Sequence, residues 1–255
     1  MKREAIAGYL FTMPAILGLL LWTVGPMAAS FIISLTDWQI IGGAEWIGLN
    51  NYTNIFYNDL FFKKSLIVTI YYSLGSVIFT MMASIIVALF MNYEIKGQAF
   101  FRTVFYLPTI VPVVASSMLW VWMFNPDFGL LNAILKAFGM KGLMWIYDET
   151  TAIPSLILMS VWGCGSAALI ILAGLQDVPK HLLEAVEIDG GNWWHKFRFI
   201  TIPMISPVIF FNLVMGLISS LQAFTQSYVM TGGGPNNATL FYVYLIYREA
   251  FQQNN

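Results

Sequence analysis

The chain has 255 residues, of which 58% are hydrophobic and only 10% are charged, and its net charge is −1. A soluble domain carries about 25% charged residues, so this composition excludes a water-soluble globular protein and indicates that lipid surrounds most of the chain. The near-neutral charge gives no reason to expect a nucleic-acid partner. The single cysteine, Cys164, cannot form an intrachain disulfide.

Five apolar stretches are long enough to cross a bilayer as helices, which takes about 20 residues each. They cover residues 5–35, 66–91, 104–124, 152–174 and 202–224. The first follows two basic residues like a signal peptide, but it is too long and lacks a small-residue cleavage site. We therefore expect a membrane helix bent at Pro14 or Pro26. A sixth stretch, from Leu240, is too short to span a bilayer alone and is either interfacial or incomplete.

The distribution of Lys and Arg predicts the orientation of these spans, because cytoplasmic loops carry an excess of them. Seven of the twelve fall at the N-terminus or in the connections after spans two and four: Lys2, Arg3, Lys96, Arg102, Lys180, Lys196 and Arg198. We therefore expect a cytoplasmic N-terminus. The other five lie in longer segments on the outer side, where they weaken the bias: Lys63, Lys64, Lys136, Lys141 and Arg248.

The outer segments are also rich in aromatic residues that suit a membrane interface: Trp38, Trp46, Tyr52, Tyr57, Trp145 and Tyr147. Within residues 127–140, five apolar side chains follow helical spacing: Leu130, Leu131, Ile134, Leu135 and Phe138. This pattern predicts an amphipathic helix, which either lies on the outer surface or packs between spans.

The connection at residues 177–200 reads as a helix, a glycine turn and a second helix. Pro179 suits a first helical turn and Asp177 is a candidate cap before it. Polar Lys180, His181, Glu184 and Glu187 share one helical face, and apolar Val178, Leu182, Ala185 and Val186 share the other. Gly190 and Gly191 end the helix, Asp189 or Asn192 caps the next, and Pro203 opens the fifth span.

This connection, EAVEIDGGNWWHKFRFITIPMISP, resembles the EAA loop of ABC-importer permeases. The matching residues are Glu184, Ala185, Asp189, Gly190, Phe197, Pro203 and Pro207. Val186, Gly191 and Ile202 are mild departures from the pattern. Residues 46–56, 105–132 and 231–235 also resemble the carbohydrate branch of these permeases, on the side of the MalF and UgpA types.

The resemblance implies an all-α integral membrane protein with the transmembrane domain of a type I ABC importer and about six helices, the last missing or incomplete. Residues 1–65 would form an N-terminal span and outer loop, and residues 66–255 the transport domain. Relatives continue beyond a segment like residues 247–255 into a final span, so we expect a truncated chain. The implied location is the bacterial inner membrane.

The resemblance also implies the partners: a second permease, two cytoplasmic ATPases and an extracytoplasmic solute-binding protein, with membrane lipid around them. Glu184 would pair with a basic residue of an ATPase, with Ala185, Phe197 and Pro203 in the same loop, and Gly190 would allow the turn. Asp189 is expected to cap the turn rather than contact the ATPase. The implied cargo is a sugar or oligosaccharide, or glycerol phosphate.

Other chemistry finds little support in the sequence. His181, Glu184 and His195 are too few to form a metal site, which needs three or four ligands. The chain has no GxxxxGK[ST] phosphate loop, so ATP and Mg²⁺ are expected on partner subunits and no cofactor on this one. A secondary transporter would carry ionisable coupling residues within its spans, and a membrane enzyme would need converging catalytic groups; neither pattern is present in the sequence.

The spans instead carry small and neutral polar residues. The candidate substrate pathway consists of Gly163, Ser166, Ser219, Ser220 and Gln222, with Trp162 and Tyr228 nearby. Hydroxyls and amides suit sugar hydroxyls, whereas small residues also allow helices to pack closely. For Gly163 and Ser166 the two interpretations are balanced; for the other three the pathway is favoured. The Gly-Gly-Gly-Pro run at residues 232–235 predicts a turn outside the membrane, where a binding protein docks in relatives.

Overall fold

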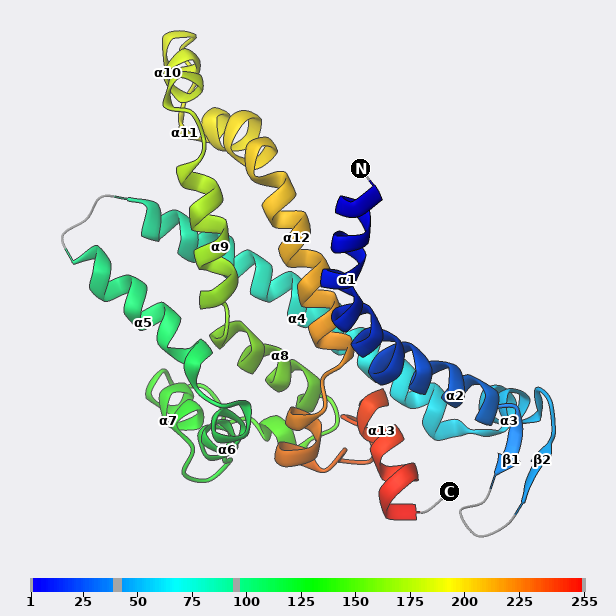
Figure 1. Cartoon of the computed structure of the whole chain (residues 1–255). Coiled ribbons are helices and arrows are strands. Elements are labelled where there is room, and N and C mark those ends of the chain that lie inside the picture. The colour runs from blue at the N-terminus through cyan, green and yellow to red at the C-terminus, as the bar shows by residue number, and fades with distance from the viewer. Residues whose placement is uncertain (1, 39–42, 94–96, 254–255) are drawn as a thin grey trace. The chain divides into compact units, whose positions relative to one another are not determined.

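A computed structural model describes residues 2–38, 43–93 and 97–253, without the side chains of residues 2–5 and 253. The basic side chains of Lys2, Arg3 and Lys96, which support the orientation prediction, therefore lie outside the described part. The chain forms two compact units, residues 1–60 and 61–255 (Figure 1).

The first unit contains a long apolar helix followed by a small outer segment. Helix α1 (Lys2–Leu19) continues through the π-turn η1 (Leu20–Val24) into α2 (Gly25–Ile33), and the direction changes between them (Figure 1). The change occurs just before Pro26, which has no N–H to donate, and the Gly25 N–H donates five residues back, to Leu20 O. Of the two predicted bend sites, Pro14 lies inside α1.

A short hairpin and a helix complete this unit. Strands β1 (Thr36–Trp38) and β2 (Ala44–Trp46) pair antiparallel, with Thr36 opposite Trp46, and are a minor departure from the expected all-α fold. Helix α3 (Asn50–Asn58) follows. The Asn51 side-chain amide donates to Ser34 O and Thr36 O, both at 3.0 Å, and ties α3 to the end of the apolar helix.

The second unit begins with helix α4 (Leu60–Asn92), which confirms the predicted helix at 66–91. The single helix expected over residues 104–124 is wrong. The chain forms α5 (Gln98–Ile110) and α6 (Val113–Met123), which meet at 100°. Pro112 lacks an N–H and forces the preceding residue, Val111, into an extended conformation (φ −70°, ψ 128°), so the helix cannot continue.

The stretch at 152–174 is also broken, though less sharply. Helices α8 (Ala152–Trp162) and α9 (Gly165–Gln176) meet at 48° around Gly163 and Cys164. In contrast, α11 (Trp193–His195), the π-turn η3 (Lys196–Thr201) and α12 (Ile202–Leu221) form one continuous helix. The separate second helix predicted in the 177–200 connection is therefore the first part of the fifth span.

Among the described residues, three helices are long and apolar enough to cross a membrane: Ile6–Ile33, Leu60–Asn92 and Trp193–Leu221. The two bent pairs would raise this number to five if each pair crosses once. Helices α9 and α12 lie side by side in the second unit, and α10 (Lys180–Ile188) stands at the end of α9 (Figure 1).

The remaining elements of the second unit are short. They are α7 (Leu130–Ala137), the 3₁₀ turn η2 (Trp145–Tyr147), the π-turn η4 (Ser227–Thr231), α13 (Tyr242–Arg248) and η5 (Glu249–Gln253). One hydrophobic cluster joins α4, α6, α8 and α13, and a second joins α4, α9 and α12. The sixth apolar stretch contributes Leu240, Phe241, Tyr244 and Leu245 to the first cluster, so its apolar side chains are buried within this unit.

The predicted amphipathic helix at 127–140 forms as α7. Leu130, Ile134 and Phe138 are exposed, whereas Asn132 is buried. The Asn132 amide uses all of its bonding capacity: Nδ2 donates to Pro126 O and Leu143 O, and Oδ1 accepts from Leu143 N–H and Trp145 Nε1. This network fastens α7 to the chain before and after it.

Candidate functional site

Helix α10 projects from the end of α9 as a short, solvent-facing element (Figure 1). It begins after Pro179, which is extended (φ −64°, ψ 125°) and so lies one residue before the first helical turn predicted for it. The predicted cap at Asp177 is wrong, because Asp177 ends α9 and donates its own N–H to Ala173 O. Val178 and Leu183 pack on the cluster formed by α4, α9 and α12 and hold α10 in place.

The turn after α10 is a Schellman motif. The Gly190 N–H donates to Glu187 O at 3.0 Å, and the Gly191 N–H donates to Val186 O at 2.8 Å. Gly190 has a φ of +78°, in the left-handed region that side chains with a Cβ avoid. The sequence prediction that glycine ends this helix is confirmed. Gly190 adopts the left-handed conformation, and Gly191 approaches Val186 too closely to carry a Cβ.

The chain then enters α11 through a capping box. The Asn192 side-chain oxygen accepts from the His195 N–H at 3.1 Å, and the Asn192 N–H donates to His195 Nδ1 at 3.3 Å. Of the two predicted caps, Asn192 fills the role and Asp189 does not. Across the turn, Lys196 forms an ion pair with Glu187. The turn is thus fixed from both of its helices.

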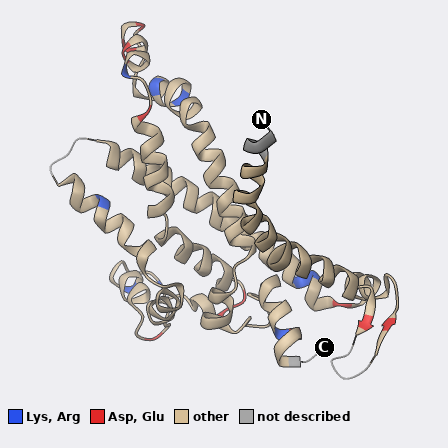
Figure 2. Cartoon of the chain, in the orientation of Figure 1, with Lys and Arg blue, Asp and Glu red and all other residues tan. Residues whose placement is uncertain are grey.

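The predicted loop residues divide into an exposed group and an anchoring one. Glu184, Ala185, Asp189 and Gly190 are exposed, and Figure 2 marks where basic and acidic residues fall along the ribbon at this end of the second unit. Ala185, which the sequence places on the apolar face of α10, is exposed, whereas Leu182, Leu183 and Val186 are partly buried. Phe197 is half-buried and stacks on Trp193 at 5.2 Å between ring centroids.

Phe197 and Trp193 also border a small cavity of about 210 Å³ between α10 and the adjoining ends of α4 and α9. Pro203 lies exposed in the first turn of α12, two residues into the helix. The loop residues that the resemblance names therefore share one end of the second unit, although they do not converge on one point.

A second, larger cavity of about 630 Å³ lies within the second unit, walled by α4, the α5–α6 bend, α8, α9 and α12. Four of the predicted pathway residues line it: Gly163, Ser166, Ser219 and Ser220. Gln222 does not; it is exposed at the end of α12, and Gln226 lines the cavity instead. Further polar residues of the wall were not predicted as site residues: Tyr72, Ser76, Thr80, Ser116, Ser160 and Asn212.

Hydrogen bonding separates these polar groups into two sets. Several already donate to helix backbone: Ser76 to Ser73 O, Ser160 to Ile157 O, Ser220 to Leu217 O and Asn212 to Val208 O. Thr80 and Ser160 also approach each other at 3.4 Å. Within the described part of the chain, no such bond is formed by the side chains of Tyr72, Ser116, Ser166, Ser219 or Gln226. The second set can donate to a bound molecule without breaking an internal bond.

Two features of the sequence could have identified the cavity-lining residues that were not predicted as site residues. Tyr72, Ser76 and Thr80 recur every four residues along an apolar helix, which places them on one face. Pro108 and Pro112 are also four residues apart, a spacing that no uninterrupted helix tolerates well. The helix continues through Pro108 and breaks at Pro112, and the bend there carries Val111, Val113 and Ser116 to the cavity.

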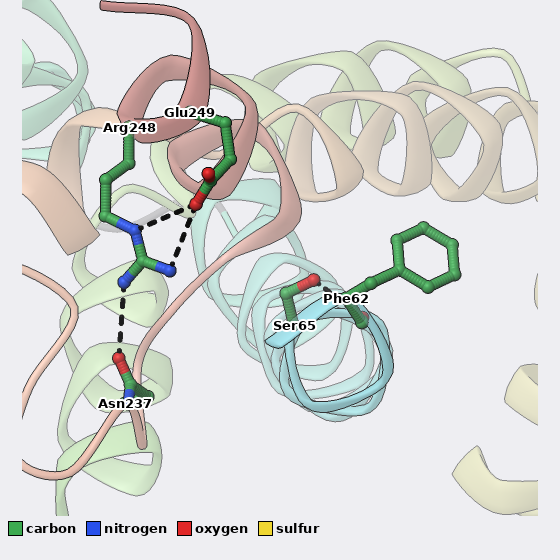
Figure 3. A network of polar contacts seen from close by, with 5 residues as sticks. All are labelled: Phe62, Ser65, Asn237, Arg248 and Glu249. Atoms are coloured by element: carbon green, nitrogen blue, oxygen red, sulfur yellow. Dashed lines mark hydrogen bonds and ion pairs between the residues drawn. The ribbon is translucent and has the colours of Figure 1, made fainter. Parts of the chain in front are cut away.

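At the other end of the second unit, basic residues hold the glycine-rich loop. Lys64 donates to Asn236 O, and Arg248 lies between Glu249, at 3.4 Å, and the Asn237 side-chain oxygen, at 3.5 Å (Figure 3). The predicted turn is confirmed, with Gly232 and Gly233 in the left-handed region. Lys64, which weakened the orientation prediction, thus has a structural role in this loop.

Comparison with known proteins decides the family. The profile of the "binding-protein-dependent transport system inner membrane component" family matches residues 80–253, more than half of the chain. The chain belongs to this family. It is therefore a membrane component of a transport system, as the sequence predicted.

Two curated relatives of this permease are transport permeases by name. It is 40% identical over 254 residues to the probable ABC transporter permease YesP of Bacillus subtilis, covering 98% of this chain and 82% of YesP. It is 34% identical to the trehalose/maltose transport permease MalF of Thermococcus litoralis, covering 93% of this chain and 81% of MalF.

A solved structure supports the fold of the permease. A chain of a bacterial alginate ABC transporter superposes with a TM-score of 0.82 at 23% identity, covering 99% of this chain and 85% of that one. The likeness confirms the predicted all-α importer fold. Within the described residues, no group of three or more His, Cys, Asp or Glu could hold a metal ion.

Proposed function

We propose that this permease is one of two membrane subunits of an ATP-driven importer for a neutral saccharide. Two cytoplasmic ATPases bind and hydrolyse ATP with Mg²⁺, and an extracytoplasmic binding protein delivers the cargo. The loop at 177–200 receives the motion of the ATPases, and the 630 Å³ cavity is this subunit's part of the cargo route.

The geometry of α10 supports the coupling role. An element that transmits force must keep its shape and must present groups that a partner can contact. The Schellman turn, the capping box and the Lys196–Glu187 ion pair hold α10 against the helix that continues into α12. Glu184 remains exposed on α10 and free to pair with a basic group of an ATPase. Ala185, Asp189 and Gly190 surround it on the same exposed tip, Phe197 packs against Trp193 behind the turn, and Pro203 lies further along the helix that follows.

The proposal that the cargo is a neutral saccharide rests on the chemistry of the cavity wall. Its wall combines neutral hydroxyl and amide groups with apolar and aromatic side chains such as Tyr72 and Trp162, and all of its lining residues are uncharged. A saccharide presents hydroxyl edges and apolar ring faces, which match such a wall. The named cargoes of relatives include trehalose and maltose, arabinooligosaccharides and sn-glycerol-3-phosphate. Phosphate groups are usually bound by Arg or Lys, so the wall favours the neutral cargoes.

The proposed orientation places the α10 loop and the N-terminus in the cytoplasm of a bacterial cell. Lys180, Lys196 and Arg198 cluster at the loop, consistent with the excess of basic residues on cytoplasmic connections. The loop held by Lys64 and Arg248, at the other end of the second unit, then faces outward, where a binding protein can reach it.

Uptake measurements test this function. The permease is reconstituted in proteoliposomes with its companion permease, the ATPases and the binding protein, and radiolabelled trehalose and maltose are offered with and without enclosed ATP. We expect ATP-dependent accumulation of at least one sugar and none when the ATPase is omitted. Accumulation without the ATPase would identify a self-sufficient secondary transporter instead, and uptake of glycerol phosphate alone would overturn the neutral-cargo assignment.

A further inference from the structure

We infer that Tyr72 and Ser116 are specificity-determining residues, whose hydroxyl groups donate hydrogen bonds to hydroxyls of the saccharide in the 630 Å³ cavity. The inference rests on the proposed function, because it assumes that the cargo passes through this cavity. It extends that function to the wall formed by α4 and the α5–α6 bend, away from the predicted pathway residues on α9 and α12.

Both residues are buried yet keep their polar group accessible. Tyr72 is 3% exposed and Ser116 is 6% exposed. No described residue forms a hydrogen bond with either hydroxyl. The described side-chain atoms that are both sealed and unpartnered are Ser73 Oγ, Arg102 Nε and Trp120 Nε1. Because neither hydroxyl is among these sealed atoms, each reaches open space, and the open space that both residues border is the cavity.

The surrounding structure positions both residues, although their hydroxyls form no hydrogen bond with a described residue. The Tyr72 ring packs on Phe241, with ring centroids 4.6 Å apart, in the hydrophobic cluster shared by α4 and α13. Ser116 lies in the first turn of α6, just after the bend, and its N–H donates to Pro112 O at 3.0 Å. A fixed hydroxyl loses little conformational entropy on binding, so its hydrogen bond contributes more fully to affinity.

The next residue, Ser117, provides a contrast to Ser116, because its hydroxyl forms a hydrogen bond within the helix. Ser117 is fully buried and its hydroxyl donates to Val113 O at 2.8 Å, which satisfies it within the helix. The Ser116 hydroxyl forms no such bond with a described residue, although the Ser116 N–H donates to Pro112 O four residues earlier. A polar occupant of the cavity can therefore bond the Ser116 hydroxyl without displacing an internal hydrogen bond.

The chemistry fits a hydroxylated, uncharged ligand. A phenol and a serine hydroxyl can each donate and accept one hydrogen bond, as sugar hydroxyls also do. Apolar Met81, Leu156 and Met159 line the space between the polar groups and suit the C–H faces of a sugar ring. A site that bonds a cargo hydroxyl discriminates strongly against an analogue that lacks it.

Two substitutions remove the hydroxyls while keeping the shape of the wall: Tyr72→Phe and Ser116→Ala. The matched controls are Tyr244→Phe, a buried tyrosine that does not line the cavity, and Ser117→Ala. Each variant is co-expressed with the companion permease and ATPases, checked for assembly and melting temperature, and reconstituted with the binding protein. Uptake of trehalose is then compared with uptake of its monodeoxy analogues.

We expect each cavity substitution to lower trehalose uptake about fivefold, the equivalent of one net hydrogen bond, while both controls stay within about twofold of wild type. For one deoxy analogue the loss should disappear, because the bonding partner is already missing from the sugar. Equal losses for trehalose and every analogue, or no loss, would overturn the inference. If wild type takes up no saccharide at all, the proposed function fails first, and the two failures are thus distinct.

Discussion

The Gly191 N–H donates to Val186 O at 2.8 Å, and a Cβ placed on Gly191 would lie 2.4 Å from Val186 Cγ1 and 2.8 Å from that carbonyl oxygen. Two of the three residues that depart from the EAA pattern, Val186 and Gly191, therefore touch each other. Val186 is larger than the alanine of the pattern and Gly191 is smaller, and a methyl group of Val186 occupies the space that a Cβ at position 191 would need. These two departures from the pattern therefore fit each other sterically in the structure.

The contact between Gly191 and Val186 predicts that the effects of substitutions at these two positions on stability are not additive. Gly191→Ala should destabilise the loop by about 1–3 kcal/mol, because a β-branched valine in a helix has few rotamers with which to avoid the added methyl group. Val186→Ala in the same chain should recover part of that loss. Melting temperatures of the purified complex for both single variants and the double variant measure the coupling; strictly additive effects would mean that the contact is absent.

The hydrogen bonds of the Asn132 amide predict that Asn132→Asp, a change that keeps the shape of the side chain, lowers the stability of the fold. Asn132→Asp replaces a donor that bonds Pro126 O and Leu143 O with a carboxylate oxygen that faces the same two carbonyls. A buried group left without its partners costs about 1–3 kcal/mol, and more when it is charged. The melting temperature should fall further for Asn132→Asp than for Asp127→Asn, an exposed control in the preceding turn. Equal shifts would contradict this account of the network.

Gly165 and Gly75 both lie where two helices touch, but we expect only Gly75 to tolerate substitution by alanine. A Cβ on Gly165 of α9 would lie 2.1 Å from Phe105 O of α5, a backbone atom that cannot move without displacing the helix. A Cβ on Gly75 of α4 would lie 2.4 Å from Ile157 Cδ1, the end of a flexible side chain. Gly165→Ala should therefore lower the yield of assembled complex sharply, whereas Gly75→Ala should be nearly neutral. Size-exclusion profiles in detergent compare them, and a tolerated Gly165→Ala would be inconsistent with the close approach of α5 and α9.

The orientation can be tested with a single thiol, because the native Cys164 is buried. Ala185→Cys places a thiol on the exposed tip of α10, and Glu149→Cys places one on the exposed turn before α8. In intact cells, a membrane-impermeant maleimide should label Glu149→Cys and spare Ala185→Cys until the cells are opened. The reverse pattern would place the α10 loop outside and contradict a cytoplasmic coupling surface.

Much of this fold follows from local sequence. The apolar stretches that became α4 and α12, the glycine end of α10 and the turn at residues 232–235 were all predicted, because each depends on composition or on one residue's backbone preference. The break between α5 and α6 was missed because hydropathy does not register it. The apolar run continues past Pro112, although the helix ends there.

The candidate sites were harder to predict, because they depend on tertiary contacts. Asp189 and Asn192 are equally good caps by residue type, and only the path of the turn selects Asn192. Gln222 and Gln226 differ by one helical turn, and only the end of α12 places the second in the cavity wall. Tyr72 became a candidate only when the cavity and its unused hydroxyl were both visible.

The most direct test of the account is capture of the ATPase through α10. The complex is co-expressed and purified in detergent by a tag on this permease, for wild type, Glu184→Arg, Gly190→Pro and the control Glu149→Arg. The arginine reverses the charge offered to a basic partner, and proline cannot adopt the φ of +78° at Gly190. We expect wild type and the control to retain the ATPase, and both loop variants to lose it while still binding the companion permease. Full retention of the ATPase by both loop variants would contradict the claim that this loop is the coupling surface.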